Sequence, residues 1–399
     1  MSSLKGSRVV LGITGGIAAY KAVEVSRRLV DAGAHVVPIL TEGAEHFVGR
    51  TTFDALASEK VQTSLWDEQS PIPHTTLGQS ADLIVVAPAT ARVLSDYRVG
   101  RSADLLTTTL IATAAPVLLA PAMHTEMWEH PAVQENLEIL AERGVHIVPA
   151  EAGRLAGGDI GFGRLAAPAT IVAHAERVLS SGDLEGQRVV ITAGGTSEPI
   201  DAVRVISNRS TGKQGYALAE AAWARGADVT LISAADREAP VGVTVVDVST
   251  AAEMQDAVMA VSDADVIVMA AAVADFRPAD PADHKIKKEG SSPPQIELEK
   301  THDFLVDLGE KKPAGQVLVG FAAETDDLIA NAKAKLERKQ LDLIVANDVS
   351  APDAGFAHDT NKVSILVSNG TQVEVPLSSK RVVADAIFDA VVRVQTTLP

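Results

Sequence analysis

Two stretches of this chain follow the same plan, and this internal repeat constrains the fold more than any other feature. RVVLGITGG begins at Arg8 and RVVITAGG begins at Arg188, and each is an apolar, largely β-branched run that ends at paired glycines. A helical pattern, a glycine and a second apolar run follow each of them. Further on, ADLIVVAPAT (81–90) and ADVIVMAAAVAD (264–275) form another matching pair. The order strand, glycine turn, helix, strand predicts a doubly wound α/β domain in each half.

The two predicted domains meet in the polar segment SSGDLEG, between Ser180 and Gly186. The chain has 399 residues, which is enough for two or three compact domains. Continuous apolar strands that alternate with helices are typical of parallel sheets covered on both faces. We therefore expect two Rossmann-like α/β domains, 1–184 and 185–399, whose ligands lie beyond the carboxyl ends of the strands.

The composition excludes several classes of protein. The formal net charge is −17 and no basic stripe offsets it, so we expect no nucleic-acid partner. No cysteine is present, which excludes disulfides, Cys-ligated zinc and a thiol nucleophile, and fits a cytoplasmic protein. The longest apolar runs, such as Val266–Ala274, are too short to cross a bilayer, so we expect no association with membranes.

Small residues and hydroxyls follow the predicted strands of the first half. Gly12, Gly15 and Gly16 allow a tight turn and a close approach of the main chain to a ligand, just before a helix. A site for NAD places an acidic residue at the end of the second strand, but Thr41 stands there, and Thr90 ends the third strand. This pattern favours flavin mononucleotide. It speaks against the alternative of a nicotinamide dehydrogenase or epimerase with a duplicated dinucleotide fold.

Three further segments of the first half are candidates for chemistry. His74 lies in SPIPHTTLG, where the prolines should prevent a helix, and its imidazole is either a base or a surface side chain. PAMHTEMWEH, 121–130, follows a predicted buried strand, and its Met and Trp are equally explained as core residues. RLAGGDIGFGR, 154–164, is too rich in glycine for a packed element and is either a mobile lid or a linker.

The second half carries an insertion in its first strand-to-helix connection. This insertion contains most of ISNRSTGKQG, 206–215, which resembles a phosphate loop but is not a Walker loop. Ser207 stands where that motif has its first glycine, and Gln214 follows Lys213 where it has Ser or Thr. Loops at this end of an α/β sheet usually bind ligands, and a surface loop with a favourable turn is the alternative.

Together these motifs resemble those of a known family. GGIAAYK, His74, PAMHTEMW and AGGDIGFGR occur in the order found in flavin-containing cysteine decarboxylases. GGTSEPIDAVRVISNRSTGKQG, AAAVADFRP, HKIKK and GFAAET follow them. With these, essentially the whole chain resembles the bacterial bifunctional phosphopantothenoylcysteine decarboxylases/phosphopantothenate–cysteine ligases of coenzyme A biosynthesis.

The resemblance implies a flavodoxin-like first domain that binds FMN and decarboxylates 4′-phosphopantothenoylcysteine to 4′-phosphopantetheine. In the family the flavin oxidises the cysteinyl thiol, and the resulting thioaldehyde makes loss of carbon dioxide easy. His74 matches the catalytic histidine, and His124 replaces an asparagine that clamps the substrate carboxylate. Gly157 replaces the cysteine that donates a proton, so either another acid does so here or this half works poorly. The implied flap contains Gly157, Gly158 and Asp159, and the implied FMN-binding residues are Gly15, Gly16, Ile17, Thr41, Ala87 and Thr90.

For the second domain, the resemblance implies the CTP-dependent joining of L-cysteine to 4′-phosphopantothenate through an acyl-cytidylate. Asn208 and Arg204 match residues that hold this intermediate, and Lys285 matches a lysine that closes over the triphosphate. Asp275 is the candidate for placing Mg²⁺. The implied CTP-binding residues are Ala271, Asp275, Lys285, Asp303, Phe304, Phe321, Lys335 and Lys339. Without the resemblance, a solvated face is the simpler interpretation of KIKK and of lysines 335 and 339.

The resemblance also implies a large closed homo-oligomer built from decarboxylase trimers and ligase dimers, such as a dodecamer. One alternative of a different class is a flavin-binding scaffold, because relatives of the decarboxylase have lost catalysis and act as interaction subunits. The missing Cys and Asn raise that alternative for the first half only. His74 and the complete ligase motifs argue against it for the whole chain.

Overall fold

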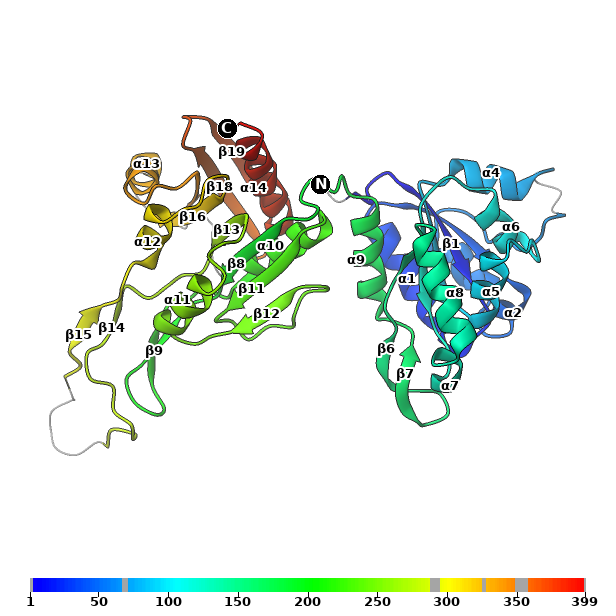
Figure 1. Ribbon diagram of the computed structural model, residues 1–399, viewed down its shortest axis with the longest axis horizontal. Coiled ribbons are helices and arrows are strands. Elements are labelled where there is room, and N and C mark those ends of the chain that lie inside the picture. Colours follow the sequence, from blue (N-terminus) through cyan, green and yellow to red (C-terminus); the bar gives the residue numbers. More distant parts are fainter. Residues whose placement is uncertain (1–2, 67–70, 288–294, 325–327, 349–357, 398–399) are drawn as a thin grey trace. The chain divides into compact units, whose positions relative to one another are not determined.

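The computed structural model describes residues 3–66, 71–287, 295–324, 328–348 and 358–397. The chain divides by its internal contacts into two compact units, Met1–Ser181 and Gly182–Pro399, where the sequence predicts a division between residues 184 and 185. Figure 1 colours the first unit from blue to green and the second from green to red. None of the helices in the described part of the chain combines the length and the apolar character needed to cross a membrane.

The first unit is an alternation of strands and helices. Its strands are β1 (Arg8–Ile13), β2 (His35–Leu40), β3 (Leu83–Ala89), β4 (Val117–Pro121), β5 (His146–Ile147), β6 (Glu151–Arg154) and β7 (Ile160–Arg164). Its helices are η1 (Ile17–Tyr20), α1 (Lys21–Asp31), α2 (Glu42–Glu45), α3 (Arg50–Leu56), α4 (Pro73–Ser80), α5 (Ala91–Arg98), α6 (Leu105–Ile111), α7 (Thr125–Trp128), α8 (Pro131–Glu142) and α9 (Pro168–Val178).

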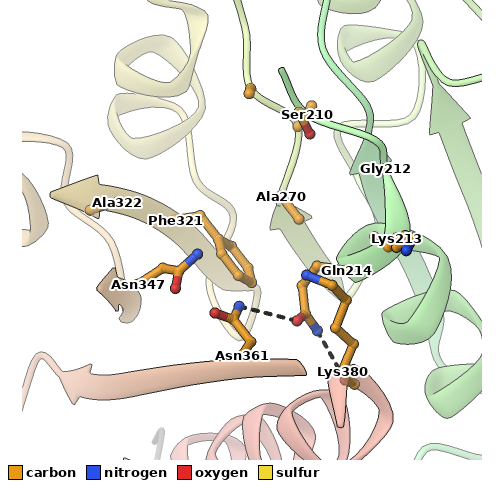
Figure 2. A pocket seen from close by; sticks show the side chains of 13 residues that line it. Ser210, Gly212, Lys213, Gln214, Ala270, Phe321, Ala322, Asn347, Asn361 and Lys380 are labelled. Carbon is orange, nitrogen blue, oxygen red and sulfur yellow. Dashed lines mark hydrogen bonds between the residues drawn. The ribbon is translucent and has the colours of Figure 1, made fainter. Parts of the chain in front are cut away.

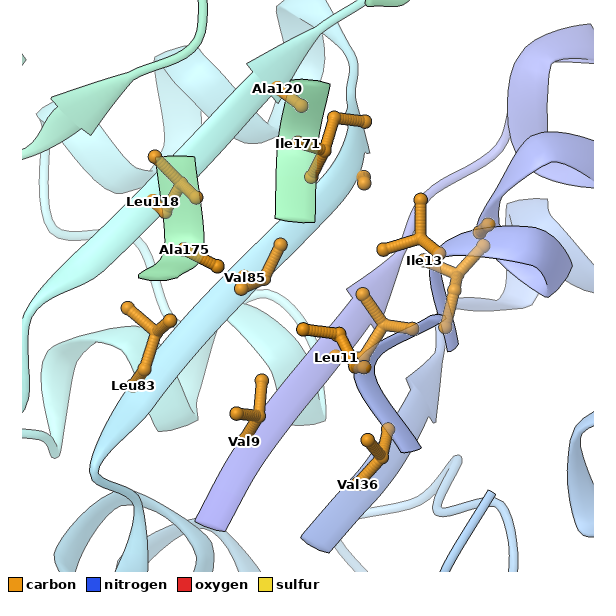
Figure 3. Close-up of a cluster of buried hydrophobic side chains, with 14 of the residues drawn as sticks. Val9, Leu11, Ile13, Val36, Leu83, Val85, Leu118, Ala120, Ile171 and Ala175 are labelled. Atoms are coloured by element: carbon orange, nitrogen blue, oxygen red, sulfur yellow. The ribbon is translucent and has the colours of Figure 1, made fainter. Parts of the chain in front are cut away.

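Its central sheet is parallel and has the strand order β2-β1-β3-β4-β5, which is the order of flavodoxin-like folds. Alternate residues of β1 face opposite sides of the sheet. Val9, Leu11 and Ile13 belong to the same apolar cluster as residues of α1 and α9, whereas Val10 belongs to a cluster with residues of α4, α5, α6 and α8. Figure 3 shows the first cluster, in which Ile171 and Ala175 of α9 lie beside residues of β3 and β4. Helices therefore cover both faces, as the apolar strands predict.

Two sequence predictions about local structure in this unit are wrong. The glycine-rich stretch 154–164 does form a packed element, since it belongs to an antiparallel hairpin of β6 and β7 whose glycines 161 and 163 lie against the segment after β4. Its role as a lid stays a prediction. The stretch around His74 is helical, because Pro73 occupies the first turn of α4, where its missing N–H costs nothing.

The second unit contains a larger sheet and two small hairpins. Its strands are β8 (Arg188–Ala193), β9 (Ser197–Pro199), β10 (Val205–Ser207), β11 (Asp228–Ser233), β12 (Thr244–Asp247), β13 (Val266–Met269), β14 (Phe276–Pro278), β15 (Leu298–Lys300), β16 (Val317–Glu324), β17 (Leu343–Asp348), β18 (Thr360–Val367) and β19 (Gln372–Ser379). Its helices are α10 (Lys213–Ala224), α11 (Ala251–Met259), α12 (Phe304–Glu310), α13 (Leu328–Arg338) and α14 (Lys380–Gln395).

The larger sheet has the order β12-β11-β8-β13-β16-β17-β18-β19. Its first six strands are parallel and have the Rossmann order 3-2-1-4-5-6, whereas β18 and β19 add an antiparallel hairpin at one edge. Helices α11, α12 and α13 pack on one face in a single apolar cluster. Helices α10 and α14 pack against each other and against the strands on the other face.

The insertion predicted after the first strand of this unit forms the antiparallel hairpin of β9 and β10. A second hairpin, β14 and β15, contacts the first one, and Asp201 forms an isolated bridge to Ala282 between them. The 206–215 stretch therefore runs from β10 through a short loop into the N-terminus of α10. Its polar residues lie beyond the carboxyl end of β8, where a doubly wound sheet places ligands.

Candidate active sites

A large pocket lies at the carboxyl ends of β1, β3 and β4 in the first unit. Its volume is about 670 Å³, which is within the range of small-molecule sites. The loops after these strands form its floor, and the β6–β7 hairpin forms one wall. It is lined by Gly15, Gly16, Ile17, Ala18, Tyr20, Lys21, Pro88, Thr90, Ala91, Ala122, Met123, His124, Met127, Arg154, Leu155, Ala156, Gly163, Arg164 and Leu165. The walls are largely apolar, with a few polar groups that converge on the space.

The glycine turn after β1 brings two main-chain segments into contact. A side chain at Gly15 would begin 2.7 Å from the carbonyl carbon of Gly43, so only glycine fits there. Gly12, which the sequence pattern groups with this turn, serves the core instead, because its Cα faces the side chain of Leu106. Thr14 closes the turn by donating a hydrogen bond of 2.6 Å to the carbonyl of Pro88.

His124 carries the main electrostatic feature of this pocket. Its Nδ1 contacts a carboxylate oxygen of Glu126, and its Nε2 lies 3.2 Å from an oxygen of Asp159, on the hairpin turn. The hydrogen bonds to Glu126 and then to Asp159 raise the pKa of the imidazole. Lys21 also lines this pocket; its Nζ donates to the carbonyl of Leu165 over 2.9 Å, and burial lowers its pKa. The pocket thus holds an imidazole between two carboxylates, and an amine, next to apolar walls.

The structure gathers most of the predicted flavin-site residues, but not all of them. Gly15, Gly16, Ile17, Thr90 and His124 line the pocket, and Asp159 contacts His124. Gly157 and Gly158 form the turn of the hairpin, where Gly158 N–H donates to Leu155 over 3.0 Å.

Three predicted residues have other surroundings. Thr41 precedes α2 and donates to the carbonyl of Ile13 over 3.2 Å, away from the lining. The Ala87 side chain is fully buried in the core, which leaves only its main chain for a ligand. His74 is half-buried on α4 and is not among the described residues that line the pocket, and its Nδ1 finds no hydrogen-bond partner among them.

A smaller pocket of about 120 Å³ lies at the carboxyl ends of β8, β13, β16 and β17 in the second unit (Figure 2). It is lined by Ser210, Gly212, Lys213, Gln214, Gly215, Ala270, Ala271, Ala272, Phe321, Ala322, Asn347, Asn361 and Lys380. Of the predicted residues, Ala271 and Phe321 belong to this lining. The volume accommodates a phosphate or another small part of a ligand rather than a whole nucleotide.

Positive charge gathers at this second pocket. Lys380 is only 7% exposed, and burial, with a contribution from Lys213, lowers its pKa to about 8. Lys213 Nζ lies 2.7 Å from a carboxylate oxygen of the exposed Asp359. The N-terminus of α10 also begins here, so its partial positive charge adds to that of the two lysines.

Two asparagines and a glutamine complete the polar lining, as Figure 2 shows. Gln214 donates to the carbonyl of Lys380 over 3.1 Å and accepts from Asn361 over 3.4 Å. Asn347 lies at the end of β17 and is 7% exposed, and its Oδ1 finds no hydrogen-bond partner among the described residues. A buried amide oxygen is normally hydrogen-bonded, so Asn347 offers an acceptor to a water or a ligand in this pocket.

Asn208 is anchored to the pocket residues Ala272 and Ser210, whereas Arg204 is anchored at the turn of the β9–β10 hairpin. Asn208 Nδ2 donates to the carbonyl of Ala272, and its Oδ1 accepts from Ser210 N–H over 3.0 Å. Arg204 forms an ion pair with the buried Asp201 and donates to the carbonyl of Ile286 over 3.0 Å. This ion pair holds the pKa of Asp201 well below its usual range.

The contact between Arg204 and Ile286 also fixes the position of the main chain next to Lys285, the lysine predicted to close over the triphosphate. Ile286 N–H donates to Asp201 over 3.0 Å, so the Lys285 segment is tied to the Arg204 loop, and Lys285 itself is exposed. The last lysine of KIKK, together with 325–327, lies outside the described residues.

The remaining predicted CTP residues form a separate group around the second hairpin. Lys339 Nζ lies 2.8 Å from Asp303, and Lys335 is one helical turn before it. Asp275 is exposed after the loop that follows β13. The Phe304 side chain is an exception, since it is 2% exposed and packs in the core, so only its main chain is open to a nucleotide. Within the described residues, no cluster of three metal-ligating side chains occurs.

The chain is similar to known proteins over nearly its whole length. Residues 1–180 match the Flavoprotein family, and residues 184–394 match the DNA/pantothenate metabolism flavoprotein C-terminal domain family. The coenzyme A biosynthesis bifunctional protein CoaBC of Mycobacterium tuberculosis (strain ATCC 25618 / H37Rv) is 48% identical over 402 residues, which cover 96% of each chain. This chain belongs to the CoaBC family. CoaBC of Bacillus subtilis (strain 168) is 48% identical over 385 residues, or 94% of each chain.

One solved structure, the C-terminal domain of a CoaBC protein, is 39% identical and covers 54% of this chain and all of that one, with a TM-score of 0.47. Membership of the CoaBC family confirms the resemblance found in the sequence. It also makes this chain a bifunctional enzyme, a lyase and a ligase, whose first half is a flavoprotein.

Sequence reasoning missed several lining residues of this CoaBC family member. Asn347, Asn361 and Lys380 lie on β17, β18 and α14, far along the chain from the 206–215 stretch. The signal for Asn347 was available, because it ends an apolar strand, as Thr90 does. Lys380 follows two serines and has no such signal, because its burial depends on how α14 packs on the sheet.

Proposed function

We propose that this protein performs two consecutive steps of coenzyme A biosynthesis. The second unit joins L-cysteine to 4′-phosphopantothenate at the expense of CTP, through an acyl-cytidylate. The first unit then decarboxylates 4′-phosphopantothenoylcysteine to 4′-phosphopantetheine with FMN. The observation that carries this proposal is that a chain similar to CoaBC along its length has a pocket at the carboxyl ends of the parallel strands in each unit.

The pocket of the first unit fits FMN. Its volume suits a tricyclic ring, its walls are largely apolar, and the glycine turn at Gly15 and Gly16 exposes main-chain N–H groups suited to a phosphate. We propose that these glycines, Ile17 and Thr90 hold the cofactor, with Ala87 contributing only its main chain. The flavin supplies the reversible two-electron oxidation of the substrate thiol. A yellow protein with an FMN spectrum that binds no nicotinamide nucleotide supports this assignment.

The position of His74 supports a site shared between copies of the chain. His74 does not line the pocket of its own unit in the described residues, yet it matches the family's catalytic histidine. We propose a homo-oligomer in which a second copy brings His74 to the flavin, with decarboxylase trimers and ligase dimers building a larger particle such as a dodecamer.

Complementation between inactive chains tests the shared site. His74→Asn removes the base, and Gly15→Val obstructs the flavin turn, so each variant alone should release no carbon dioxide. Co-expressed chains should regain activity, because a mixed interface joins an intact pocket to an intact histidine. Two copies of His74→Asn differing only in their purification tags serve as the control. Mixed oligomers that remain as inactive as this control would rule out the shared site.

The pocket of the second unit suits the phosphate of 4′-phosphopantothenate. Lys213, Lys380 and the N-terminus of α10 supply positive charge, and Ser210 supplies a hydroxyl. The amide N–H of the ligand, or its hydroxyl, can donate to Asn347. We propose that Asn208 and Arg204 hold the activated carboxyl group next to this pocket. CTP then lies towards Ala271, Asp275 and Phe321, with Lys285, Lys335, Lys339 and the Asp303 region around its triphosphate.

Lys380 should control the affinity for the phosphorylated substrate. Lys380→Met removes a charge-assisted contact of about 1.5–3 kcal/mol, so kcat/KM for 4′-phosphopantothenate should fall by about 10–100-fold, with KM for CTP little changed. Steady-state kinetics with each substrate varied in turn measures this. A loss that falls equally on CTP would contradict the assignment.

The pH dependence gives a second readout of the same residue. Because burial lowers the pKa of Lys380 to about 8, the free enzyme loses this charge as the pH rises through that value. The kcat/KM for 4′-phosphopantothenate should therefore decline above about pH 8. In Lys380→Arg the decline should disappear, since a guanidinium stays protonated.

Mg²⁺ should be needed only for the ligase. Divalent magnesium is normally held by nucleotide phosphates with one or two carboxylates, and Asp275 is the candidate here. Excess EDTA should stop CTP-dependent CMP release and leave the decarboxylation of added 4′-phosphopantothenoylcysteine unchanged. Equal inhibition of both reactions would contradict a magnesium requirement confined to the nucleotide site.

A further inference from the structure

The pocket of the first unit holds an imidazole placed between two carboxylates. His124 directly precedes α7, three residues after the end of β4, and its side chain is 39% exposed and lines the pocket. The carboxylate of Glu126, on α7, contacts His124 Nδ1. The carboxylate of Asp159, in the turn of the β6–β7 hairpin, lies 3.2 Å from His124 Nε2. With both nitrogens facing carboxylates, the doubly protonated imidazolium is the favoured form, because each N–H then has an acceptor.

The hairpin turn also brings residue 157 to this imidazole. A Cβ at Gly157 would lie 3.6 Å from His124 Nε2 and 3.2 Å from the Asp159 carboxylate. A side chain at that position would therefore begin where the His124 proton is held. The turn is fixed by hydrogen bonds of Leu155 N–H to Asp159 (2.8 Å) and of Gly158 N–H to Leu155 (3.0 Å).

The other titratable groups that line the pocket are poorer proton donors. Arg154 and Arg164, on the two hairpin strands, carry guanidinium groups, a side-chain type that does not act as a proton donor in proteins. Lys21 is held by its hydrogen bond to the carbonyl of Leu165. The side chain of Tyr20 is 61% exposed, so solvent competes for its hydroxyl proton. Among the described lining residues, His124 alone combines three features. Its Nε2 can give up a proton, the carboxylate of Glu126 holds the Nδ1 proton, and the ring lies next to the turn of the β6–β7 hairpin.

We propose that His124 is the general acid of the decarboxylation, with Glu126 as its positioning residue. This proposal rests on the proposed function of the first unit. Departure of carbon dioxide leaves an electron pair on the substrate carbon, delocalised as an ene-thiolate. That pair forms a new C–H bond with the proton of His124 Nε2, the N–H bond breaks, and the imidazole becomes neutral. Asp159 must move off Nε2 for this transfer, whereas Glu126 keeps the Nδ1 proton in place.

The product of that protonation is a thioaldehyde. When bound, FMN would return to this thioaldehyde, as a hydride, the two electrons that it took from the substrate thiol. A proton on the sulfur then completes 4′-phosphopantetheine. His124 regains its proton from water. The redox balance over the cycle is zero, and the net change is the loss of carbon dioxide.

His124→Asn tests the proposal through its product. The variant should still bind flavin and release carbon dioxide from 4′-phosphopantothenoylcysteine. It should stop at the ene-thiol, which mass spectrometry finds two hydrogens lighter than 4′-phosphopantetheine, with the flavin absorbance bleached. The yield of 4′-phosphopantetheine should fall at least tenfold. His130→Asn, on the same segment, is the matched control and should give the normal product.

A second variant distinguishes loss of the proton donor from damage to the fold, because it restores a donor without restoring the imidazole. In His124→Asn with Gly157→Cys, the new thiol begins at the position next to the removed imidazole, and formation of 4′-phosphopantetheine should return. In the protein without substrate, NMR should find that Glu126→Gln lowers the pKa of the His124 imidazole, which needs no turnover.

Three results would overturn the proposal. They are normal 4′-phosphopantetheine from His124→Asn, loss of carbon dioxide release in that variant with flavin still bound, and an unchanged His124 pKa in Glu126→Gln. An unmodified protein that releases no carbon dioxide from 4′-phosphopantothenoylcysteine would instead reject the proposed function of the first unit.

Discussion

Replacing His74 by asparagine is expected to abolish carbon dioxide release while the protein keeps its flavin. The residue lies on α4, half-buried, and does not line the pocket of its own unit in the described residues, so its loss leaves that unit's cofactor contacts intact. Removal of a positioned base typically costs about 10²–10⁴-fold in rate. Single-turnover measurement of carbon dioxide from 4′-phosphopantothenoylcysteine, with the flavin spectrum recorded in parallel, gives both quantities.

His46→Asn is the matched control for this result, because His46 is an exposed histidine of the same unit. It should retain both flavin and activity. Near-normal carbon dioxide release by His74→Asn would reject His74 as the base. Loss of the flavin from this variant would show that the residue supports the fold or the oligomer and not the chemistry.

Asn208→Asp is expected to stall the ligase after the nucleotide has been transferred. The side chain of Asn208 donates to Ala272 and accepts from Ser210 N–H. The carboxylate of the variant still accepts from Ser210 N–H, but it has no proton to donate to the Ala272 carbonyl. It also places negative charge where the attack by cysteine develops an oxyanion. That step should slow by about 10²–10³-fold. Pyrophosphate should still be released, and the acyl-cytidylate should accumulate and be visible by mass spectrometry.

The chain offers a matched control for this substitution. Asn369 is exposed in the turn between β18 and β19, and its Oδ1 accepts from Thr371 N–H over 2.9 Å, the same local contact that Asn208 makes with Ser210. Asn369→Asp should turn over normally. If Asn208→Asp also turns over normally, or if it fails to release pyrophosphate, the assigned role of Asn208 is wrong.

The repeat in the sequence predicts both sheets because buried parallel strands and glycine turns leave a strong pattern. The flavodoxin-like and Rossmann orders fit it, and the pocket of each unit includes residues from the predicted strand ends, such as Thr90 and Ala271. Predictions of local structure are wrong where one residue type is compatible with two kinds of secondary structure. Pro73 is one example, because proline breaks a helix in its interior but is accepted in its first turn, where Pro73 lies.

The rest of the site depends on packing, which a linear pattern does not encode. Lys380 becomes a pocket residue because the antiparallel strands β18 and β19 return the chain to the ligand end of the sheet before α14 begins. Likewise, the contact between His124 and Asp159 follows from the hairpin folding back over the loop after β4. Neither pairing can be derived from spacing along the sequence.

The most direct test of the whole account is to give the flavin-loaded protein 4′-phosphopantothenate, L-cysteine, CTP and Mg²⁺ and to identify the products by mass. We predict 4′-phosphopantetheine, CMP, pyrophosphate and carbon dioxide, each formed only when CTP is present. Accumulation of 4′-phosphopantothenoylcysteine without further conversion would contradict the account of the first unit, and the absence of any CTP-dependent product would contradict it for the second.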